Sequence, residues 1–246
     1  MATNIPALEL LIEVSRHTHP IKLRRQCVHD VRRLYHSRLS RLRGYNLFMI
    51  TISIQAGGRS SRIGRNKCLL PLGGSPLIEH VLNRVRNLGD EIIITSNRPE
   101  QLHYLGLPII SDERPGAGSL EGLHTALNSA SGEVVLVLAC DLPFLSCALL
   151  QRQISLAKAA DIIIPRKDGF FEPLHAVYRK ESCLPALQRA RSRGEKRVMS
   201  FWANLNIQTV EGEELKALDP RGLSFFNINT LENLGEAEAL LLSLQE

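Results

Sequence analysis

A loop rich in glycine and basic residues follows the first strongly apolar run of this 246-residue chain. The run covers residues 49–54, and the loop extends from Gly57 and Gly58 to Lys67. Two glycines let the chain turn sharply and let another group approach its backbone. Main-chain amides beside cations bind anions, so the loop predicts a cradle for a polyphosphate. An ordinary basic surface loop is the alternative, and the loop alone does not decide between them.

Two cations of this loop are candidates for neutralising charge during a reaction. Lys67 is the single lysine after the loop, and Arg62 precedes it. Positive charge here would offset negative charge that builds up on phosphates. The lysine lies too far from the glycines for a GxxxxGK[ST] motif and lacks a following Ser or Thr, which disfavours an ATPase of that kind. A solvated surface lysine is the alternative for Lys67.

Polar residues also follow three other apolar runs. Asp141 comes directly after the run EVVLVLAC, and a carboxylate leaving a buried strand is well placed to hold Mg²⁺. Asn97 and Asp112 follow two further runs and offer acceptors for hydrogen bonds with a ribose or a base. Each of the three has an alternative role as a cap or turn residue.

Two other reactive side chains are Cys140 and His175. No base neighbours Cys140 in the sequence, so we expect a small buried cysteine. His175 lies in a strand pattern, where it is packed, hydrogen-bonded or turned toward a second substrate. The sequence contains no Ser-His-Asp order, HExxH or EF-hand pattern.

The elements that must position these residues alternate in type from residue 49 onward. We expect strands over 49–54, 91–95, 108–111, 133–139 and 161–165, and helices over 76–88, 120–130 and 146–159. The alternation predicts an α/β fold with a parallel sheet covered by helices on both faces. Such a sheet binds its ligand at the carboxyl ends of its strands, so the glycine loop, Asn97, Asp112 and Asp141 are expected along one edge.

The later part of the chain is less regular. We expect a strand over 171–178, helices over 182–193 and 197–205, and a short strand over 226–229. A final helix is expected over 231–244, with Thr230 as its N-cap.

The positive charge is concentrated at the start of the chain. Residues 1–48 hold nine Lys/Arg and three Asp/Glu (+6), and the remaining 21 basic and 22 acidic residues balance to −1. An interpretation as a nucleic-acid-binding protein therefore depends on this segment alone. Its few aromatic residues are not interleaved with the basic ones, as stacking on bases would require, so nucleic acid is not an expected partner. We expect residues 1–48 to be a basic N-terminal extension, disordered or arising from a start site misplaced upstream of Met49, and residues 49–246 to be one domain.

The location expected from the sequence is the cytoplasm, without membrane contact. No apolar run is long enough to span a bilayer. Five scattered cysteines without a CxxC pair fit a reducing compartment better than a disulfide framework or a zinc site.

Five segments resemble the molybdenum cofactor guanylyltransferase family, the MobA-like nucleotidyltransferases. These segments are AGGRSSRIGRNK (56–67), LLPLGG (69–74), ACDLPFL (139–145), EPLHAVYR (172–179) and FFNINT (225–230). The first alone marks the wider nucleotidyltransferase superfamily, and all five in this order are considerably more specific. The resemblance covers about residues 49–244 and implies a Rossmann-like three-layer sandwich with a mostly parallel central sheet.

The resemblance also implies an activity and a set of contacts. The activity is transfer of GMP from GTP to molybdopterin carrying molybdenum, with release of pyrophosphate and with Mg²⁺ as cofactor. Implied catalytic residues are Lys67, Asp141 and Arg62. The implied binding residues are Gln55, Ala56, Gly57 and Gly58 through their backbone, Lys67 on phosphate, Asn97 and Asp112 on GTP, Asp141 on GTP and the metal, and Asn229 beside the metal or pterin.

Two positions depart from the family pattern. Asn66 stands where an acidic residue is usual, which raises the local positive charge. Gln55 stands where leucine is common, and this is harmless if only its backbone meets the nucleotide.

The implied mechanism needs no catalytic histidine. The terminal phosphate of the pterin, with a second pKa of about 6, is largely ionised at neutral pH and requires no general base. The protein must instead align and neutralise two anionic reactants. The expected partners are GTP and molybdopterin, with transient contact to cofactor delivery proteins or apo-molybdoenzymes.

Three other enzymes and one binding protein stay open as alternatives at this point. The enzymes are a CTP-dependent molybdopterin cytidylyltransferase, a guanylyltransferase acting on another phosphorylated small molecule, and a sugar-phosphate nucleotidyltransferase. The binding protein is a non-catalytic one that contacts nucleic acid through residues 1–48.

Overall fold

The structure is a computed structural model that describes residues 48–57 and 66–244. The chain divides into two units, residues 1–47 and 48–246, and all described residues belong to the second. Most of the basic N-terminal extension and most of the glycine-rich loop, including Gly58 and Arg62, lie outside the described residues.

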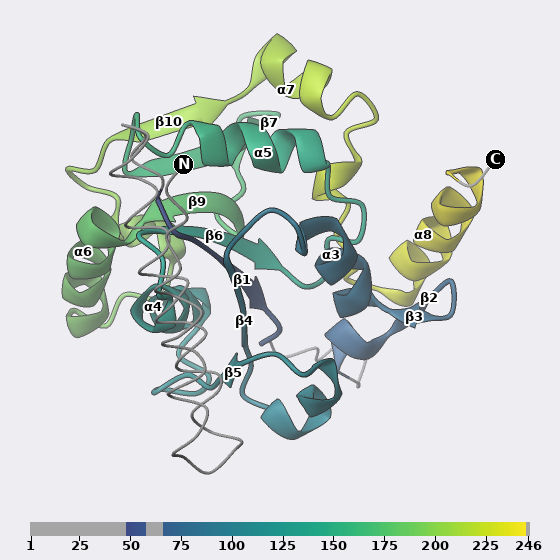
Figure 1. Cartoon of the computed structure of the whole chain (residues 1–246), viewed down its shortest axis with the longest axis horizontal. Helices are drawn as coiled ribbons and strands as arrows, with labels where there is room; N and C mark the ends of the chain where they lie inside the picture. Colours follow the sequence, from purple (N-terminus) through teal and green to yellow (C-terminus); the bar gives the residue numbers. More distant parts are fainter. Residues whose placement is uncertain (1–47, 58–65, 245–246) are drawn as a thin grey trace, which may run out of the picture. The chain divides into compact units, whose positions relative to one another are not determined.

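The second unit is built on a mixed sheet of eight strands (Figure 1). Seven follow the order β10-β7-β9-β6-β1-β4-β5, and β8 pairs with β7. The pairs β1–β4, β1–β6, β4–β5 and β7–β10 are parallel, while β9 is antiparallel to β6 and to β7. The mostly parallel sheet predicted from the sequence is therefore confirmed. The strands are β1 Ile50–Gln55, β4 Glu91–Thr95, β5 Ile109–Ile110, β6 Val134–Ala139, β7 Ile162–Lys167, β8 Phe170–Phe171, β9 His175–Arg179 and β10 Ile207–Val210.

Helices cover both faces of the sheet, which gives the three layers expected. Side chains of α3, α5 and α7 share one apolar cluster on one face, and those of α4 and α6 share another on the opposite face. A short hairpin, β2 Pro71–Leu72 and β3 Ser75–Pro76, packs with α8. The helices are α3 Leu77–Val85, α4 Ser119–Ser129, α5 Cys147–Ser155, α6 Lys180–Ser192, α7 Gly212–Leu218 and α8 Leu231–Ser243. Among the residues that the structure describes, no helix is both long and apolar enough to cross a membrane.

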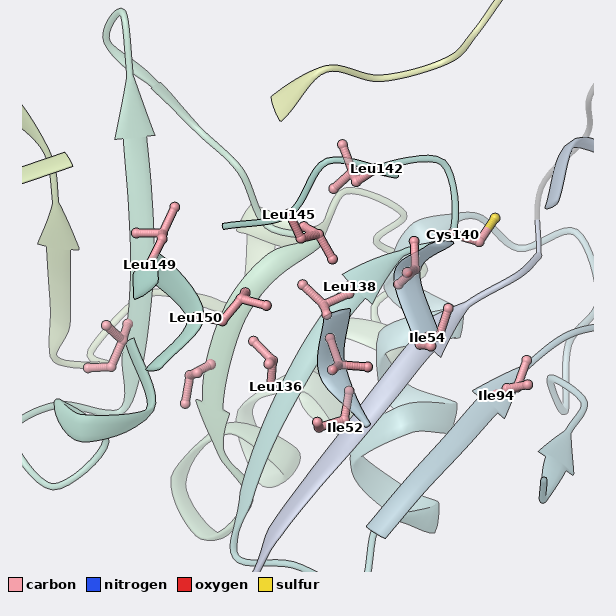
Figure 2. Packing of buried hydrophobic residues seen from close by; sticks show 14 of the residues in the cluster. Ile52, Ile54, Ile94, Leu136, Leu138, Cys140, Leu142, Leu145, Leu149 and Leu150 are labelled. Carbon is pink, nitrogen blue, oxygen red and sulfur yellow. The ribbon is translucent and has the colours of Figure 1, made fainter. Parts of the chain in front are cut away.

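Alternate residues of the central strands point to the two faces. Ile52 and Ile54 pack with Leu136 and Leu138 on the face that α5 covers (Figure 2). Their neighbours in β6, among them Val135, pack on the opposite face with α4 and α6. Burial on both faces explains why β6 reads as a continuous apolar run rather than an alternating one.

The strand order reverses around β1, and this reversal places the site. The chain passes from β1 through α3 to β4 on one side of β1, whereas β6 pairs with β1 on the other side. In open α/β sheets, ligands bind outside the carboxyl ends of the strands at such a reversal. The segments after β1, β4 and β6 therefore form the edge of the sheet where a ligand is expected.

The helix expected over 76–88 is shorter in the structure. It ends at Val85, and Pro76 belongs to β3 instead of the first helical turn. Gly89 serves a packing role, because a Cβ there would lie 2.9 Å from a side-chain carbon of Ile52 in β1. The glycine thus allows the turn to pass close against the central strand.

The helix expected over 197–205 is wrong. Val198–Phe201 forms only a 3-10 turn, and β10 and α7 follow it where neither was expected. The apolar residues Val198, Phe201 and Trp202 have helical spacing, but Asn204 adopts a left-handed φ of 67° that continues no helix. Trp202 packs edge-on against Phe171 with ring centroids 5.4 Å apart, so tertiary contacts fix this segment.

Two expected strands also differ. The strand over 171–178 is interrupted between β8 and β9, around Pro173, which has no amide to donate to a ladder. The segment 226–229 forms no strand, and the amide of Ile228 donates instead to the carbonyl of Asp141 at 3.1 Å. The final helix begins as expected, with the Thr230 hydroxyl accepting the amide of Asn233 at 3.1 Å.

Candidate active site

Lys67 and Asp141 meet at the rim of the sheet. Lys67 opens a 3-10 turn, Lys67–Leu69, after the glycine-rich loop, and Asp141 lies just beyond the end of β6. The Lys67 Nζ forms an ion pair with Asp141 Oδ2, and the two side chains are 15% and 14% exposed. The structure therefore joins the predicted phosphate-binding lysine to the predicted metal-binding carboxylate.

Two asparagines complete a cluster around the Lys67 ammonium. Its Nζ donates to Asn229 Oδ1 at 2.6 Å and to Asn227 Oδ1 at 3.1 Å. The bond from Ile228 N to the Asp141 carbonyl holds this segment against the end of β6. Asn227 was not singled out from the sequence, although it stands in the same FFNINT segment as Asn229. We call Lys67, Asp141, Asn227 and Asn229 the lysine cluster.

The oxygens of the lysine cluster suit a divalent cation. Asp141 Oδ1 is buried and has no hydrogen-bond partner among the described residues. One carboxylate with nearby amide oxygens is a hard donor set of the kind Mg²⁺ accepts, together with water and phosphate oxygens. Asp141 and Asn229 are the residues that would hold the ion, and the Lys67 ammonium now lies among the same oxygens.

Asn97 and Asp112 form a second pair, after β4 and β5. The Asn97 Nδ2 donates to Asp112 Oδ2 at 2.8 Å, and the Asp112 amide donates to Asn97 Oδ1 at 2.9 Å. Thr125 of α4 donates its hydroxyl to the other carboxylate oxygen of Asp112 at 2.7 Å. Nothing in the sequence pointed to Thr125. We call Asn97 and Asp112 the asparagine–aspartate pair, which Thr125 supports through its hydroxyl.

The two groups occupy different stretches of one rim. Neighbouring strands lie about 4.8 Å apart, and the order β6-β1-β4-β5 puts the end of β1 between Asp141 and Asn97. The segment at the end of β1 is Gln55–Gly57, the start of the predicted cradle. The structure thus aligns the candidate residues along the rim but does not gather them into one contact set.

The end of β1 leaves room for a ligand over Gly57. This glycine is exposed, and a Cβ added to it would meet no atom of the residues that the structure describes within 4 Å. The amide of Ala56 already donates to the Thr95 carbonyl at 2.8 Å. The Gln55 side chain points away from open solvent, because it is 8% exposed and its Nε2 donates to the Gly122 carbonyl at 3.2 Å.

Asn66 has a structural role at the position where the family usually carries an acid. Its Nδ2 donates to Gln101 Oε1 at 2.6 Å, and its Oδ1 accepts from the Cys68 thiol at 3.0 Å. Cys140 is buried, and a hydrogen bond with Cys68 together with burial raises the pKa of the Cys140 thiol well above its ordinary value. Cys140 therefore stays a thiol and offers no nucleophile.

His175 is buried in the core and contacts Phe225, which precedes Asn227 and Asn229 in the FFNINT segment. It is 0% exposed, its ring packs against Phe225 at 5.2 Å, and neither ring nitrogen has a hydrogen-bond partner among the described residues. Burial lowers the pKa of His175 to about 4, so the ring is neutral at physiological pH. It does not face a second substrate.

A further group with metal-binding side chains is already neutralised. Glu113, Glu121 and His124 place ligand atoms within 4.8 Å of one another. Arg191 donates to Glu121 at 2.6 Å and to Glu113 at 2.7 Å, so a guanidinium fills this acidic site. A metal ion here would have to displace it.

The fold and the rim define a nucleotide-binding α/β protein, and comparisons with known proteins agree. The sequence matches the MobA-like NTP transferase domain over residues 52–209. A molybdenum cofactor guanylyltransferase from Desulfosudis oleivorans is 36% identical over 196 residues, which cover 78% of this chain and 96% of that protein. A probable molybdenum cofactor guanylyltransferase from Carboxydothermus hydrogenoformans is 34% identical over 74% of this chain and 91% of that protein.

Solved structures show the same likeness. The molybdopterin-guanine dinucleotide biosynthesis protein A from Archaeoglobus fulgidus superposes with a TM-score of 0.69 at 30% identity, covering 78% of this chain and 99% of that one. A 4-diphosphocytidyl-2C-methyl-D-erythritol synthase from Anaerococcus prevotii shares the fold, with a TM-score of 0.61 at 16% identity over 79% of this chain and 96% of that one. The chain belongs to the MobA-like nucleotidyltransferase family.

Proposed function

We propose that the protein transfers GMP from GTP to molybdopterin carrying molybdenum, which forms the guanine dinucleotide and releases pyrophosphate. The observation that carries this proposal is the lysine cluster, where Lys67 and the asparagine oxygens meet Asp141 at the rim of the sheet. The names of the relatives from Desulfosudis oleivorans and Archaeoglobus fulgidus support the same reaction.

The proposal assigns a role to each of the candidate residues. Asp141 and Asn229 would hold Mg²⁺, which supplies charge neutralisation on the triphosphate when bound. Lys67, with Arg62 from the loop, would contact phosphate oxygens. Asn97 and Asp112 would bind the nucleoside by hydrogen bonds, beside the backbone of residues 55–58.

The reaction itself makes modest demands on proton transfer. A terminal phosphate oxygen of the pterin attacks the α-phosphorus of GTP, a new phosphorus–oxygen bond forms, and the bond to the bridging β-oxygen breaks. The electron pair leaves with pyrophosphate. Because the attacking phosphate is largely ionised at neutral pH, no general base is required. Lys67 exchanges its ion pair with Asp141 for the incoming phosphates, so positive charge reaches the reacting groups as they align.

The proposal includes a cytoplasmic location and transient contact with delivery proteins or apo-molybdoenzymes. The four cysteines that the structure describes are unpaired thiols, which supports a reducing compartment.

The test is turnover by the purified protein with Mg²⁺, molybdenum-loaded molybdopterin and either GTP or CTP. Pyrophosphate release and chromatography of the dinucleotide product are measured together. We expect GTP to exceed CTP by about a hundredfold in kcat/KM, because a site built to hydrogen-bond one base leaves groups unpaired with the other. Equal or preferred use of CTP would support the cytidylyltransferase. Turnover only with a sugar phosphate or another phosphorylated small molecule would replace the pterin as acceptor.

A further inference from the structure

We infer that Arg191 is a positioning residue for nucleotide binding, acting through the segment that connects Asp112 to α4. Arg191 lies near the end of α6, outside the five segments quoted for the family resemblance, and it is 70 residues from Glu121, the nearer end of the segment it contacts. The inference rests on the proposed function, because it assumes that Asp112 binds GTP.

The guanidinium joins the two ends of that segment. Arg191 Nη2 donates to Glu113 Oε2 at 2.7 Å and to Glu121 Oε1 at 2.6 Å, and Nε donates to Glu121 Oε2 at 2.7 Å. The bond to Glu121 is therefore bidentate, the strongest and most directional arrangement for this pair. Glu121 stands in the first turn of α4, and Glu113 follows Asp112 directly.

The same carboxylate also fastens the backbone of the segment. Glu121 Oε1 accepts the amide of Arg114 at 3.2 Å, which closes residues 114–121 into a loop. Within the loop, Gly116 and Gly118 adopt φ values of 82° and 101°, conformations that glycine tolerates. Leu120 donates its amide to the carbonyl of Lys196 at 3.3 Å, so the chain after α6 holds the loop at a second point.

Asp112 depends on this arrangement from two directions. Its neighbour Glu113 is held by Arg191, and its own Oδ1 is held by the Thr125 hydroxyl from α4. Because Glu121 and Thr125 are both in α4, the arginine fixes the helix and the start of the loop relative to one another. The orientation of the Asp112 carboxylate, and of the loop amides after it, is thereby set before a nucleotide arrives.

The chemistry of the group favours an arginine over a metal or a lysine. Glu121 is 2% exposed, and a carboxylate this buried is stable only when it is paired and hydrogen-bonded. His124 does not supply the counter-charge, since burial and the nearby Arg191 lower its pKa. A lysine carries the charge but lacks the planar fork that binds two carboxylates at once.

Three variants and one control test the inference. Arg191→Met removes the charge and the fork, Arg191→Lys keeps the charge alone, and Glu121→Gln keeps the shape of the buried partner. Arg189→Met, an exposed position of the same helix, is the control. We measure the Kd for GTP by calorimetry, kcat and KM for both substrates, and hydrogen exchange of residues 112–121.

Displacing the loop should weaken binding rather than chemistry. Arg191→Met and Glu121→Gln should raise the Kd and the KM for GTP by about tenfold to a hundredfold, because small misplacements of binding groups have effects of this size. The kcat at saturating GTP and the KM for the pterin should stay within about twofold of wild type. Arg191→Lys should recover part of the loss, and exchange in residues 112–121 should accelerate only in the variants of the pair.

Each contrary outcome is specific. An Arg191→Met protein that melts earlier but binds GTP as wild type shows a purely structural ion pair, and a loss confined to kcat shows the wrong role. Unchanged hydrogen exchange in residues 112–121 overturns the inference whatever the nucleotide results are. A wild-type protein that binds no GTP would contradict the proposed function, and the exchange data would still decide whether Arg191 orders the loop.

Discussion

The lysine cluster and the asparagine–aspartate pair are built in contrasting ways. The lysine cluster draws on three distant segments, around residues 67, 141 and 227–229, and its cation is paired with its own anion. The asparagine–aspartate pair follows two adjacent strands, and its members exchange two hydrogen bonds with each other. Thr125 and, through the loop, Arg191 stabilise it further.

This difference separates two tasks. In the proposed reaction, metal and phosphates bind at the lysine cluster, so Lys67 and Asp141 would exchange partners and change contacts as the reaction proceeds. A pair held by local hydrogen bonds and by a fixed helix keeps one geometry and suits recognition of an uncharged part of the ligand. We therefore expect variants of the lysine cluster to lower kcat and variants of the pair to raise KM.

Asp141→Ala should have the largest effect. Loss of the only carboxylate in the lysine cluster removes the proposed metal ligand and breaks the ion pair between Asp141 and Lys67. We expect GMP transfer, measured as pyrophosphate release, to fall by about a thousandfold, the scale of losing a preorganised electrostatic group. Circular dichroism should show an intact fold, because the side chain lies at the rim and not in the core.

Asp141→Asn is the matched control for shape. It keeps the volume and one oxygen but not the charge, so it should be nearly as inactive as Asp141→Ala. Near-normal turnover in either variant would exclude the metal-binding role and would remove the proposed division between the two groups.

Asp112→Asn should have an intermediate effect on binding. The substitution keeps the shape but removes a charged acceptor that the Asn97 amide and the Thr125 hydroxyl now contact. A hydrogen bond to a charged group contributes enough to raise the KM for GTP by about tenfold. Steady-state kinetics at saturating GTP should give a kcat close to wild type. A fall in kcat with an unchanged KM would place Asp112 with the lysine cluster instead.

Acid should destabilise the protein by protonating His175. This residue packs against Phe225, which lies in the same segment as Asn227 and Asn229 of the lysine cluster. The pKa of His175 is about 4 in the folded protein and about 6.5 when unfolded, so the unfolded chain binds an additional proton between these values. The free energy of unfolding is thus largest above pH 6.5 and falls by about 3 kcal/mol as the pH approaches 4. Urea denaturation at pH 7.5, 6.0 and 5.0 measures this slope.

His175→Leu provides the comparison. It keeps an apolar side chain against Phe225 and cannot be protonated, so its stability should change less between pH 7.5 and 5.0. The neighbouring Asp219 attracts a protonated ring and limits the effect. Parallel pH profiles for the two proteins would show that the acid sensitivity arises elsewhere.

The sequence predicted the elements whose hydrophobic pattern is continuous or strictly periodic. Glu91–Thr95 was predicted to the residue, because an apolar run between turn signals has one interpretation in an alternating α/β chain. It also predicted that Asp141 follows a strand buried on both faces. The contact between Lys67 and Asp141 required only that the two segments end at the same rim.

The errors have a common physical cause. The conformations of segments 197–205 and 226–229 are set by contacts with distant residues rather than by their local pattern. Trp202 packs against Phe171, and Ile228 donates its amide to the carbonyl of Asp141. Arg191 and Thr125 were not predicted for the same reason. Their partners are distant in the sequence, so no local sequence pattern indicates the contacts. Asn227 alone had a signal, because it stands inside the recognised segment FFNINT, two residues before Asn229.

Gln55→Leu should have the smallest effect, and it tests whether the end of β1 belongs to either group. The Gln55 side chain lies against Gly122 in α4, with its Nε2 3.2 Å from the Gly122 carbonyl, and it is almost fully buried. Leucine loses that hydrogen bond but fills similar space with an apolar side chain, so the free energy of unfolding should change by about 1 kcal/mol or less.

The kinetic outcome depends on which atoms of Gln55 meet the nucleotide. If only its backbone does, the kcat/KM for GTP should stay within about twofold, because the β1 register with β6 is unchanged. A rise in the KM for GTP comparable to that of Asp112→Asn would instead assign Gln55 to the same task as the asparagine–aspartate pair, through its contact with α4. A fall in kcat alone would join it to the lysine cluster, where no described contact of its side chain places it.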